Sequence, residues 1–421
     1  MDDVTVDAVL EALRRLPPTV RKTPLLPSST LSRISGGEVL LKAENLQHTG
    51  SFKIRGASNK IGALREQGAV AGVISASAGN HAQGLAVAAR AHGIPATIVM
   101  PRAAAIAKVE ATRDYGAEVV LHGDSYEQAY AEATRLAAER KLTIIPPYDD
   151  HQIIAGQGTV AVEIASELRD AGVILVPVGG GGLAAGVGVA IKAYMPQARV
   201  IGVQVEAAPG LRASLDAGAR TAVTTQPTIA DGVAVAAPGE ITFPILQRVL
   251  DDVVIVGEDD VAQAMVLLLE RSKLVVEGAG ALGAAALMTG KVDVAGKKTV
   301  VILSGGNVDI NMLARVVEHG LMQAGRYYSL TVGLEDKPGQ LAVLSKLLSD
   351  VGANVMSVSH QRFGIGLPVG RVQVALLLEV RNRAHAQEVD AALASHGFAR
   401  GGEGMPQFVP ASWNEEVRSG E

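Results

Sequence analysis

Short apolar runs alternate along most of the chain with segments in which apolar residues recur every three or four positions. The first pattern is typical of strands and the second of amphipathic helices. Helical spacing begins over residues 6–16, which end at Pro17 and Pro18. The predicted strands are residues 38–42, 70–75, 96–99, 118–121, 173–177, 199–206 and 298–303, and the further helices are 82–92, 103–115, 159–169 and 183–194. Strands that alternate with helices predict parallel sheets with both faces covered, so we expect an α/β fold.

The pattern changes after Gly325. Strands are expected at residues 328–334, 355–361 and 371–380, and helices at residues 340–350 and 384–395. This β-α-β-β-α order is typical of a ferredoxin-like unit. We therefore predict a linker near residues 324–326 and a separate C-terminal unit over residues 326–400. Residues 401–421 carry four Glu and one Arg, and we expect this polar tail to be poorly ordered.

Composition narrows the class of protein. With 421 residues, of which 48% are hydrophobic and 19% charged, the chain can bury a large core, and its length favours two or three domains. A net charge of -5 argues against a nucleic-acid surface, and no uncharged apolar run is long enough to span a membrane. Residues 1–4 lack the features of a secretory signal, so we expect a cytoplasmic location. The absence of cysteine excludes disulfides, thiolate metal sites and a cysteine nucleophile.

A lysine stands in an unusual setting within residues 49–56, which read Thr-Gly-Ser-Phe-Lys-Ile-Arg-Gly. Lys53 lies between Phe52 and Ile54, and burial of an ammonium group lowers its pKa and makes the amine nucleophilic. Such an amine can bond to a carbonyl cofactor. The same residues are also compatible with the first turn of an amphipathic helix that carries a solvent-directed lysine.

Three further motifs follow in order. They are residues 75–84 (Ser-Ala-Ser-Ala-Gly-Asn-His-Ala-Gln-Gly), 179–183 (Gly-Gly-Gly-Gly-Leu) and 304–309 (Ser-Gly-Gly-Asn-Val-Asp). Together with residues 49–56, they resemble the motifs of the threonine dehydratases (threonine ammonia-lyases), pyridoxal-phosphate enzymes of fold type II. The resemblance covers about residues 20–320. It implies a catalytic domain over residues 1–325 with two open, twisted, mostly parallel sheets, the smaller subdomain (about 46–150) being inserted in the larger.

The resemblance also assigns roles to residues. Lys53 would be the catalytic residue, and the cofactor would be held by Phe52, Lys53, Asn80, Gly179, Gly180, Gly181, Gly182, Leu183 and Ser304. The substrate would be bound by Ser77, Ala78, Gly79, Asn80 and His81. Asn80 would face the 3′ oxygen of the cofactor, although a helix-capping role is open to it. Ser304 would face the pyridine nitrogen, and the alternative is an ordinary turn serine.

The glycine run at residues 179–182 predicts a phosphate site. Consecutive glycines before a helix let backbone N–H groups point at an anion, which the helix dipole also favours. The phosphate could belong to pyridoxal phosphate or to a nucleotide, because Gly179, Gly181 and Ala184 match a dinucleotide motif and Glu206 closes a strand further on. A second such match, at residues 278–283, lacks the acidic strand end, and we interpret it as close helix packing.

The implied reaction is α,β-elimination, in which L-threonine gives 2-oxobutanoate and ammonia, and L-serine gives pyruvate as a side activity. A neutral Ser304 would make the cofactor ring a weaker electron sink and favour loss of the β-hydroxyl group. Serine racemases are similar, but racemisation needs an acid opposite the lysine, and Ala78 has no proton to give. Their cation site is matched at Glu206 but carries Arg212 where an acid is expected. The nine histidines show no metal-binding spacing, and no metal is predicted.

The C-terminal unit resembles a single ACT domain of βαββαβ order, through Asp-Lys-Pro-Gly-Gln-Leu at residues 336–341. A glycine at position 339 permits close approach to a bound amino acid, and Asn354 could hydrogen-bond the same ligand. The resemblance implies pairing of these domains in a homodimer or homotetramer. It also implies feedback inhibition by isoleucine, with valine able to relieve it, in branched-chain amino-acid biosynthesis. An oligomerisation unit without a ligand is the alternative.

Other functional classes account for parts of the sequence. A serine racemase or serine dehydratase would share the four motifs. An NAD-dependent dehydrogenase with an ACT tail would explain the glycine runs and Glu206, but not residues 49–56. A non-enzymatic amino-acid sensor would explain residues 326–400 alone. We expect no nucleic-acid or membrane partner in any of these cases.

Overall fold

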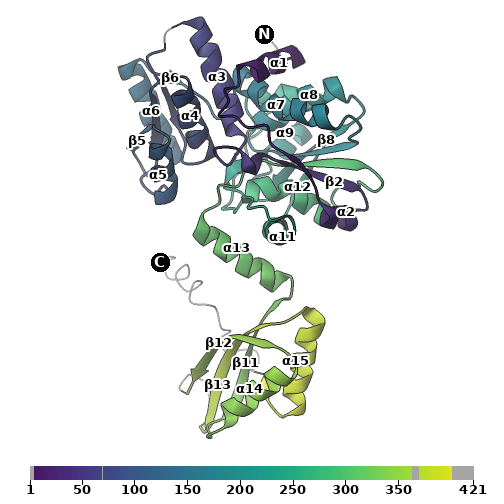
Figure 1. Cartoon of the computed structure of the whole chain (residues 1–421). Coiled ribbons are helices and arrows are strands. Elements are labelled where there is room, and N and C mark those ends of the chain that lie inside the picture. The colour runs from purple at the N-terminus through teal and green to yellow at the C-terminus, as the bar shows by residue number, and fades with distance from the viewer. Residues whose placement is uncertain (1–3, 69, 363–368, 401–421) are drawn as a thin grey trace. The chain divides into compact units, whose positions relative to one another are not determined.

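The computed structural model describes residues 4–68, 70–362 and 369–400, so the predicted polar tail lies outside the described residues. The chain divides into two compact units, Met1–Ala314 and Arg315–Glu421. Helix α13 (Ile310–Gln323) continues from the first unit into the second (Figure 1). Within the described ranges, no helix combines the length and the apolar character that a membrane span requires.

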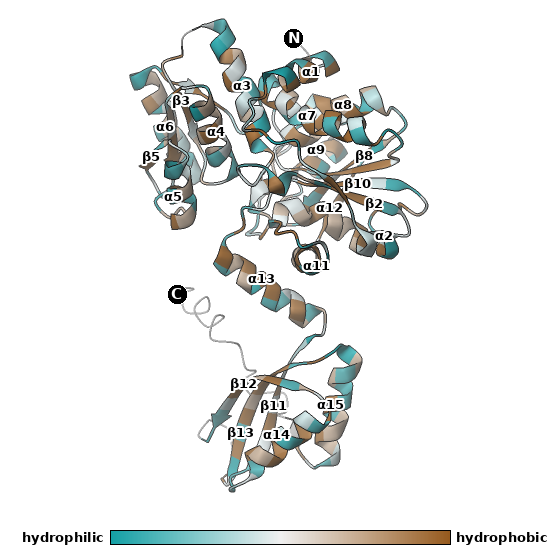
Figure 2. Cartoon of the chain, in the orientation of Figure 1, coloured by the Kyte–Doolittle hydropathy of each residue, from teal (hydrophilic) through white to brown (hydrophobic). Residues whose placement is uncertain are grey.

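A six-stranded sheet forms the larger part of the first unit. Its strand order is β1-β2-β10-β7-β8-β9, and all neighbours are parallel except β1 and β2. The strands are β1 (Leu25–Pro27), β2 (Glu38–Ala43), β7 (Val173–Pro177), β8 (Arg199–Val205), β9 (Asp252–Val256) and β10 (Lys298–Leu303). Strands β7 and β10 are almost wholly buried, as expected for parallel strands with both faces covered. Figure 2 colours the hydrophobic residues of this sheet brown, and β10 is labelled there.

Helices cover both faces of this sheet. One core cluster joins the inward faces of α1 (Val6–Arg15), α7 (His151–Glu167), α8 (Gly182–Tyr194) and α10 (Thr242–Val249) to alternate residues of β7 and β10. Helix α12 (Gly278–Met288) contacts the same strands through their other residues, Leu175 and Val301, which lie next to Gly283. The interpretation of residues 278–283 as close helix packing is therefore confirmed. The remaining helices of this part are α2 (Ser29–Ser35), α9 (Gly210–Ala217), α11 (Glu258–Leu267), η1 (Glu44–Leu46), η2 (Asp231–Val233) and η3 (Leu268–Ser272).

A smaller, four-stranded parallel sheet lies between β2 and β7 in the sequence. Its order is β5-β4-β3-β6, with β3 (Val73–Ala76), β4 (Ala96–Met100), β5 (Glu118–Leu121) and β6 (Thr143–Ile144). Helices α3 (Lys53–Gln67), α4 (Asn80–Ala91) and α5 (Ile106–Asp114) pack in one core cluster with it, and α6 (Tyr126–Arg140) packs in another. The α/β class and the parallel sheets predicted from the sequence are confirmed.

Two helices begin at least two residues earlier than the pattern predicts. Helix α7 starts at His151 instead of residue 159, because the Asp150 side chain accepts the N–H groups of Gln152 and Ile153 and caps the helix. Helix α4 starts at Asn80 instead of residue 82. Helix α3 was not predicted beyond a first turn at Lys53, since most of its residues are buried and its apolar periodicity is weak.

Besides the end of α13, the described residues of the second unit form four antiparallel strands and two helices. The strand order is β12-β13-β11-β14, with β11 (Tyr327–Glu335), β12 (Asn354–Gln361), β13 (Arg371–Glu379) and β14 (Ala399–Arg400). Helices α14 (Gln340–Asp350) and α15 (Arg383–Ser395) pack on the sheet around a separate apolar core. The elements occur in the predicted order, followed by the short strand β14.

Candidate active site

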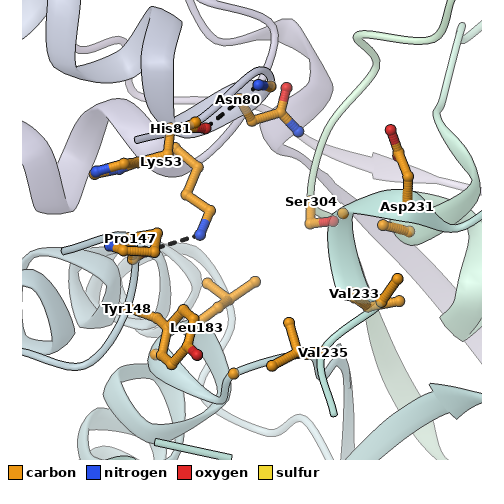
Figure 3. Close-up of a pocket in the computed structure, with 18 of the residues that line it drawn as sticks. Lys53, Asn80, His81, Pro147, Tyr148, Leu183, Asp231, Val233, Val235 and Ser304 are labelled. Atoms are coloured by element: carbon orange, nitrogen blue, oxygen red, sulfur yellow. Dashed lines mark hydrogen bonds between the residues drawn. The ribbon is translucent and has the colours of Figure 1, made fainter. Parts of the chain in front are cut away.

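A cavity of about 620 Å³ opens where strands of both sheets in the first unit end. Its walls begin at the carboxyl ends of β3, β7 and β10, the position where open parallel sheets usually bind ligands. The lining includes every residue predicted to bind cofactor or substrate, namely Phe52, Lys53, Ser77, Ala78, Gly79, Asn80, His81, Gly179, Gly180, Gly181, Gly182, Leu183 and Ser304. Motifs that are far apart in the sequence therefore meet at one place (Figure 3).

Backbone hydrogen bonds place the lysine motif beside the end of β10. The N–H of Phe52 donates to the carbonyl of Ser304 at 3.0 Å, and the N–H of Gly306 donates to the carbonyl of Gly50 at 2.8 Å. Helix α3 starts at the next residue, Lys53. The backbone at Lys53 is therefore held by these hydrogen bonds on one side and by α3 on the other. This fixes the point from which the long side chain extends.

The Lys53 side chain extends into the cavity instead of bulk solvent (Figure 3). Its Nζ donates to the carbonyl oxygen of Pro147 at 2.9 Å and lies 5.2 Å from the centre of the Phe52 ring. Desolvation lowers the pKa of Lys53 to about 8, although the charge of Glu277 acts in the opposite direction. The helix start predicted as the alternative is observed, but the amine is not directed to solvent.

The glycine run joins β7 to α8 and keeps its backbone accessible from the cavity. Gly181 is the N-cap of α8 with φ +97°, a conformation that other residues rarely adopt. At Gly180 a Cβ atom would lie 2.4 Å from the Tyr148 ring, so only glycine fits there. The hydroxyl of Thr242 donates to the carbonyl of Gly180 at 2.7 Å and holds the loop. The loop thus presents a helix N-terminus to the cavity, a suitable environment for a phosphate.

Residues 77–79 connect β3 to α4, and together with the first two residues of α4 they line another wall of the cavity. Gly79 is the N-cap of α4 and Asn80 is its first residue, so the capping role for Asn80 is wrong. The His81 ring nitrogen Nε2 lies 3.0 Å from the carbonyl oxygen of Ile145. Burial and the charge of Lys53 lower the pKa of His81 to about 3, so its ring is neutral near pH 7. The N-terminal N–H groups of α4 are available to a carboxylate.

Several cavity residues were not found from the sequence. Glu277, Tyr148, Lys108 and Asp231 all line the cavity, and Lys108 Nζ lies 3.3 Å from Asp231 Oδ2. Glu277 did carry a signal, because it is the only charged residue between Lys273 and Lys291. That signal was missed because the stretch was interpreted only through the spacing of its glycines. Tyr148 carried no comparable signal, since its contact with the glycine run arises only in the folded chain.

Outside the glycine run, the two residues that bore on a nucleotide or a cation site, Glu206 and Arg212, do not line the cavity. Glu206 is exposed outside the cavity, and its carboxylate accepts the N–H of Glu258 at 3.3 Å. Arg212 pairs with Asp216 and Asp252. In the part of the chain that the structure describes, no three His, Asp or Glu side chains gather as a metal site would require.

The residues predicted to bind an effector belong to the second unit. Gly339 is the N-cap of α14 with φ +90°, in the turn that follows β11. Asn354 is the first residue of β12, and its Nδ2 donates to Glu379 Oε2 at 3.1 Å. Both residues are exposed on the surface of this unit, and their role in binding an effector stays a prediction.

The cavity fits the chemistry of pyridoxal phosphate. A desolvated amine at Lys53 can bond to an aldehyde, and the glycine run at the start of α8 can hold a phosphate. Ser304, only 3% exposed, follows β10 in the same cavity and offers a neutral hydroxyl group. The aldehyde, the phosphate and the ring nitrogen of pyridoxal phosphate thus each have a suitable partner in Lys53, the glycine run and Ser304.

Comparison with known proteins agrees with this chemistry. Residues 16–305 match the family model described as pyridoxal-phosphate dependent enzyme. An L-threonine ammonia-lyase of Thermotoga maritima is 46% identical over 395 residues, which are 94% of this chain and 98% of the relative. The solved structure of the processed threonine deaminase isoform 2 from Solanum lycopersicum is 35% identical with a TM-score of 0.70, over 76% of this chain and 95% of that chain. The serine racemase of Dictyostelium discoideum is 36% identical with a TM-score of 0.69, over 73% of this chain and 99% of that chain. The chain therefore belongs to the family of pyridoxal-phosphate-dependent enzymes that includes the L-threonine ammonia-lyases.

Proposed function

We propose that this protein deaminates L-threonine to 2-oxobutanoate and ammonia, with L-serine as a secondary substrate that gives pyruvate. The observation that carries the proposal is one cavity in which the Lys53 amine faces the Ser77–His81 loop, the glycine run and Ser304. The 46% sequence identity to an L-threonine ammonia-lyase, over 94% of this chain, supports the choice of substrate.

Lys53 has two tasks in this reaction. Its amine would hold the cofactor through the aldehyde and, when released by the substrate amine, would take the proton from the substrate Cα. The pKa of about 8 leaves a useful fraction of the amine unprotonated near neutral pH. Bound pyridoxal phosphate supplies the electron sink that stabilises negative charge at the substrate Cα.

The other walls orient the reactants. We assign the cofactor phosphate to residues 179–183 and the substrate carboxylate to residues 77–81, each at the N-terminus of a helix. Asn80 would donate a hydrogen bond to the 3′ oxygen of the cofactor, and the Ser304 hydroxyl would form a hydrogen bond with the ring nitrogen of the cofactor. Phe52, whose ring centre lies 5.2 Å from the lysine amine, would contact the cofactor.

We favour elimination over racemisation because the loop opposite Lys53 carries no acid at the position of Ala78. Racemisation requires a group that returns a proton to the substrate face opposite Lys53. Ala78 occupies the corresponding loop position and has no proton to give. His81, with a pKa lowered to about 3 by burial, is not protonated either. The loop can therefore bind the substrate without re-protonating it.

The test is an assay of the purified full chain. We expect a visible absorption band from bound pyridoxal phosphate that borohydride removes, and 2-oxobutanoate released from L-threonine with a higher kcat/KM than pyruvate from L-serine. A colourless protein that binds no pyridoxal phosphate would refute the proposal. Formation of D-serine as the main product would instead identify a racemase.

We also propose that the second unit is an ACT domain that regulates catalysis in a homodimer or homotetramer. Its β-α-β-β-α-β order, the glycine-led turn at Gly339 and the exposed Asn354 support this assignment. The ligand would be isoleucine as inhibitor, with valine as its antagonist, and the enzyme would then act in branched-chain amino-acid biosynthesis. The cytoplasmic location stays a prediction.

Deletion of residues 326–421 is expected to preserve threonine deamination and abolish inhibition by isoleucine. The physical reason is that the active-site cavity is built entirely from the first unit. Initial rates with and without isoleucine would measure the effect. Asn354→Ala in the full chain is the finer variant, for which we expect weaker inhibition at unchanged kcat. Inhibition of the truncated protein equal to that of the full chain would contradict the regulatory role.

A further inference from the structure

Glu277 is a charged residue that the reaction scheme above does not use. It is the N-cap of α12, only 5% exposed, and it forms part of the cavity wall. Burial and the charge of Asp231 raise its pKa to about 7, while the Asn80 N–H and the charges of Lys108 and Lys53 act in the opposite direction. A carboxyl group that is costly to ionise contributes little to stability by itself, which points to a functional reason for its place.

Glu277 lies where the lysine motif (residues 49–56) meets the motif at residues 304–309. Its backbone N–H donates to the carbonyl of Gly305 at 3.0 Å. Gly305 also forms a β-bridge with Ser51 in the lysine motif. A Cβ atom at position 305 would lie 2.3 Å from Glu277 Oε1, so the carboxyl group packs directly on this turn. The carboxyl group therefore holds a defined position relative to Lys53 and Ser304.

The carboxyl group contacts Asn80 across the cavity wall. Glu277 Oε1 accepts a hydrogen bond from Asn80 Nδ2 at 2.7 Å. At the other end of the amide, Asn80 Oδ1 accepts from Asn307 Nδ2 at 2.7 Å, and Asn307 Nδ2 also donates to the carbonyl of Thr49 at 2.7 Å. In this contact Glu277 Oε1 acts as the acceptor, which it can do whether or not the other carboxyl oxygen carries a proton, and the Asn307 amide nitrogen can only donate. Together the two partners select one of the two orientations of the Asn80 amide.

We propose that Glu277 is a positioning residue that keeps the Asn80 amide nitrogen turned toward the cofactor oxygen. An amide nitrogen carries two N–H groups, and the one not bound to Glu277 is left to donate to that oxygen. Without Glu277 only the contact with Asn307 would oppose a rotation of the amide, and a rotated amide would present its own oxygen, which would repel the cofactor oxygen. This inference rests on the proposed function, because it takes Asn80 as a cofactor-binding residue.

The experiment compares Glu277→Ala, Glu277→Gln and Asn80→Ala by titrating each apo-enzyme with pyridoxal phosphate. We expect Glu277→Ala to weaken cofactor binding roughly tenfold and to shift the visible band. Glu277→Gln should stay within about threefold of wild type, since its side-chain oxygen can still accept from Asn80. The double variant Glu277→Ala/Asn80→Ala should bind no more weakly than Asn80→Ala alone, because Glu277 acts through Asn80.

Glu258→Ala is the control, since the Glu258 carboxylate accepts a hydrogen bond from the backbone N–H of Ile229 but does not line the cavity. We expect it to bind the cofactor like wild type. Wild-type affinity and spectrum in Glu277→Ala would overturn the inference, as would additive losses in the double variant. Equal losses in Glu277→Gln and Glu277→Ala, with unchanged melting temperatures, would also overturn it. A wild-type protein that binds no cofactor would instead reject the proposed function.

Discussion

Lys53→Ala is expected to abolish threonine deamination, with a loss of kcat/KM of roughly 10³-fold or more. The variant lacks both the amine that would bond to the cofactor and the base that would take the substrate proton. The visible band that depends on the covalent bond should disappear as well. Because the side chain extends into a cavity, its truncation leaves the packing of α3 in place, and circular dichroism should be unchanged.

Lys60→Ala is the control for this experiment. Lys60 lies in the same helix and is half-buried, but it pairs with Asp150 at 2.6 Å outside the cavity. We expect Lys60→Ala to retain the absorption band and the activity. A Lys53→Ala enzyme that turns over threonine at the wild-type rate would end the mechanism proposed for this cavity.

A buried network of charges supports the start of α3. Arg55 is fully buried and donates to Glu44 at 2.7 and 2.8 Å and to Glu163 at 2.6 and 2.9 Å. Lys42 Nζ, equally buried, lies 2.6 Å from Glu163 Oε2. Two positive and two negative side chains thus balance one another between β2, η1, α3 and α7. The network fixes α3 at Arg55, two residues after Lys53.

Arg55→Met is expected to destabilise the protein by about 3–5 kcal/mol, because it leaves a buried carboxylate without its partner. Burial alone would raise the pKa of Glu44, but the charge and N–H groups of Arg55 hold it below its usual value. Without Arg55 the pKa of Glu44 should rise. The loss of stability should then be largest near neutral pH and shrink as the pH falls, since a protonated carboxyl group is less costly to bury. Urea unfolding at pH 5 and pH 7 measures both effects.

Arg135→Met provides the comparison on the surface. Arg135 is exposed on α6 and pairs with Glu132 and Glu139. Exposed pairs of this kind contribute roughly 0–1 kcal/mol, so we expect little change in the urea midpoint. Equal effects of the two substitutions would contradict the structural role of the buried network.

The sequence predicted the elements of the fold better than their ends. The strands at residues 118–121 and 298–303 and the helix at residues 340–350 are observed as predicted, because their apolar patterns are regular. The start of α7 was missed because a capping carboxylate, Asp150, sets it rather than an apolar repeat. Most of α3 was missed because it is buried on nearly all sides and carries a weak periodicity.

By itself, the sequence determined the α/β class, the order of the C-terminal elements and the four motifs whose residues line the cavity. These are local properties, since a strand followed by a glycine run or a helix N-terminus can be recognised within a few positions. Only the tertiary structure decided what surrounds those residues. Asn80 and Glu277, which are 197 positions apart, form a 2.7 Å hydrogen bond, and the pKa of Lys53 depends on its desolvation inside the cavity. Contacts and desolvation depend on distance in space, which the spacing of residues along the chain does not record.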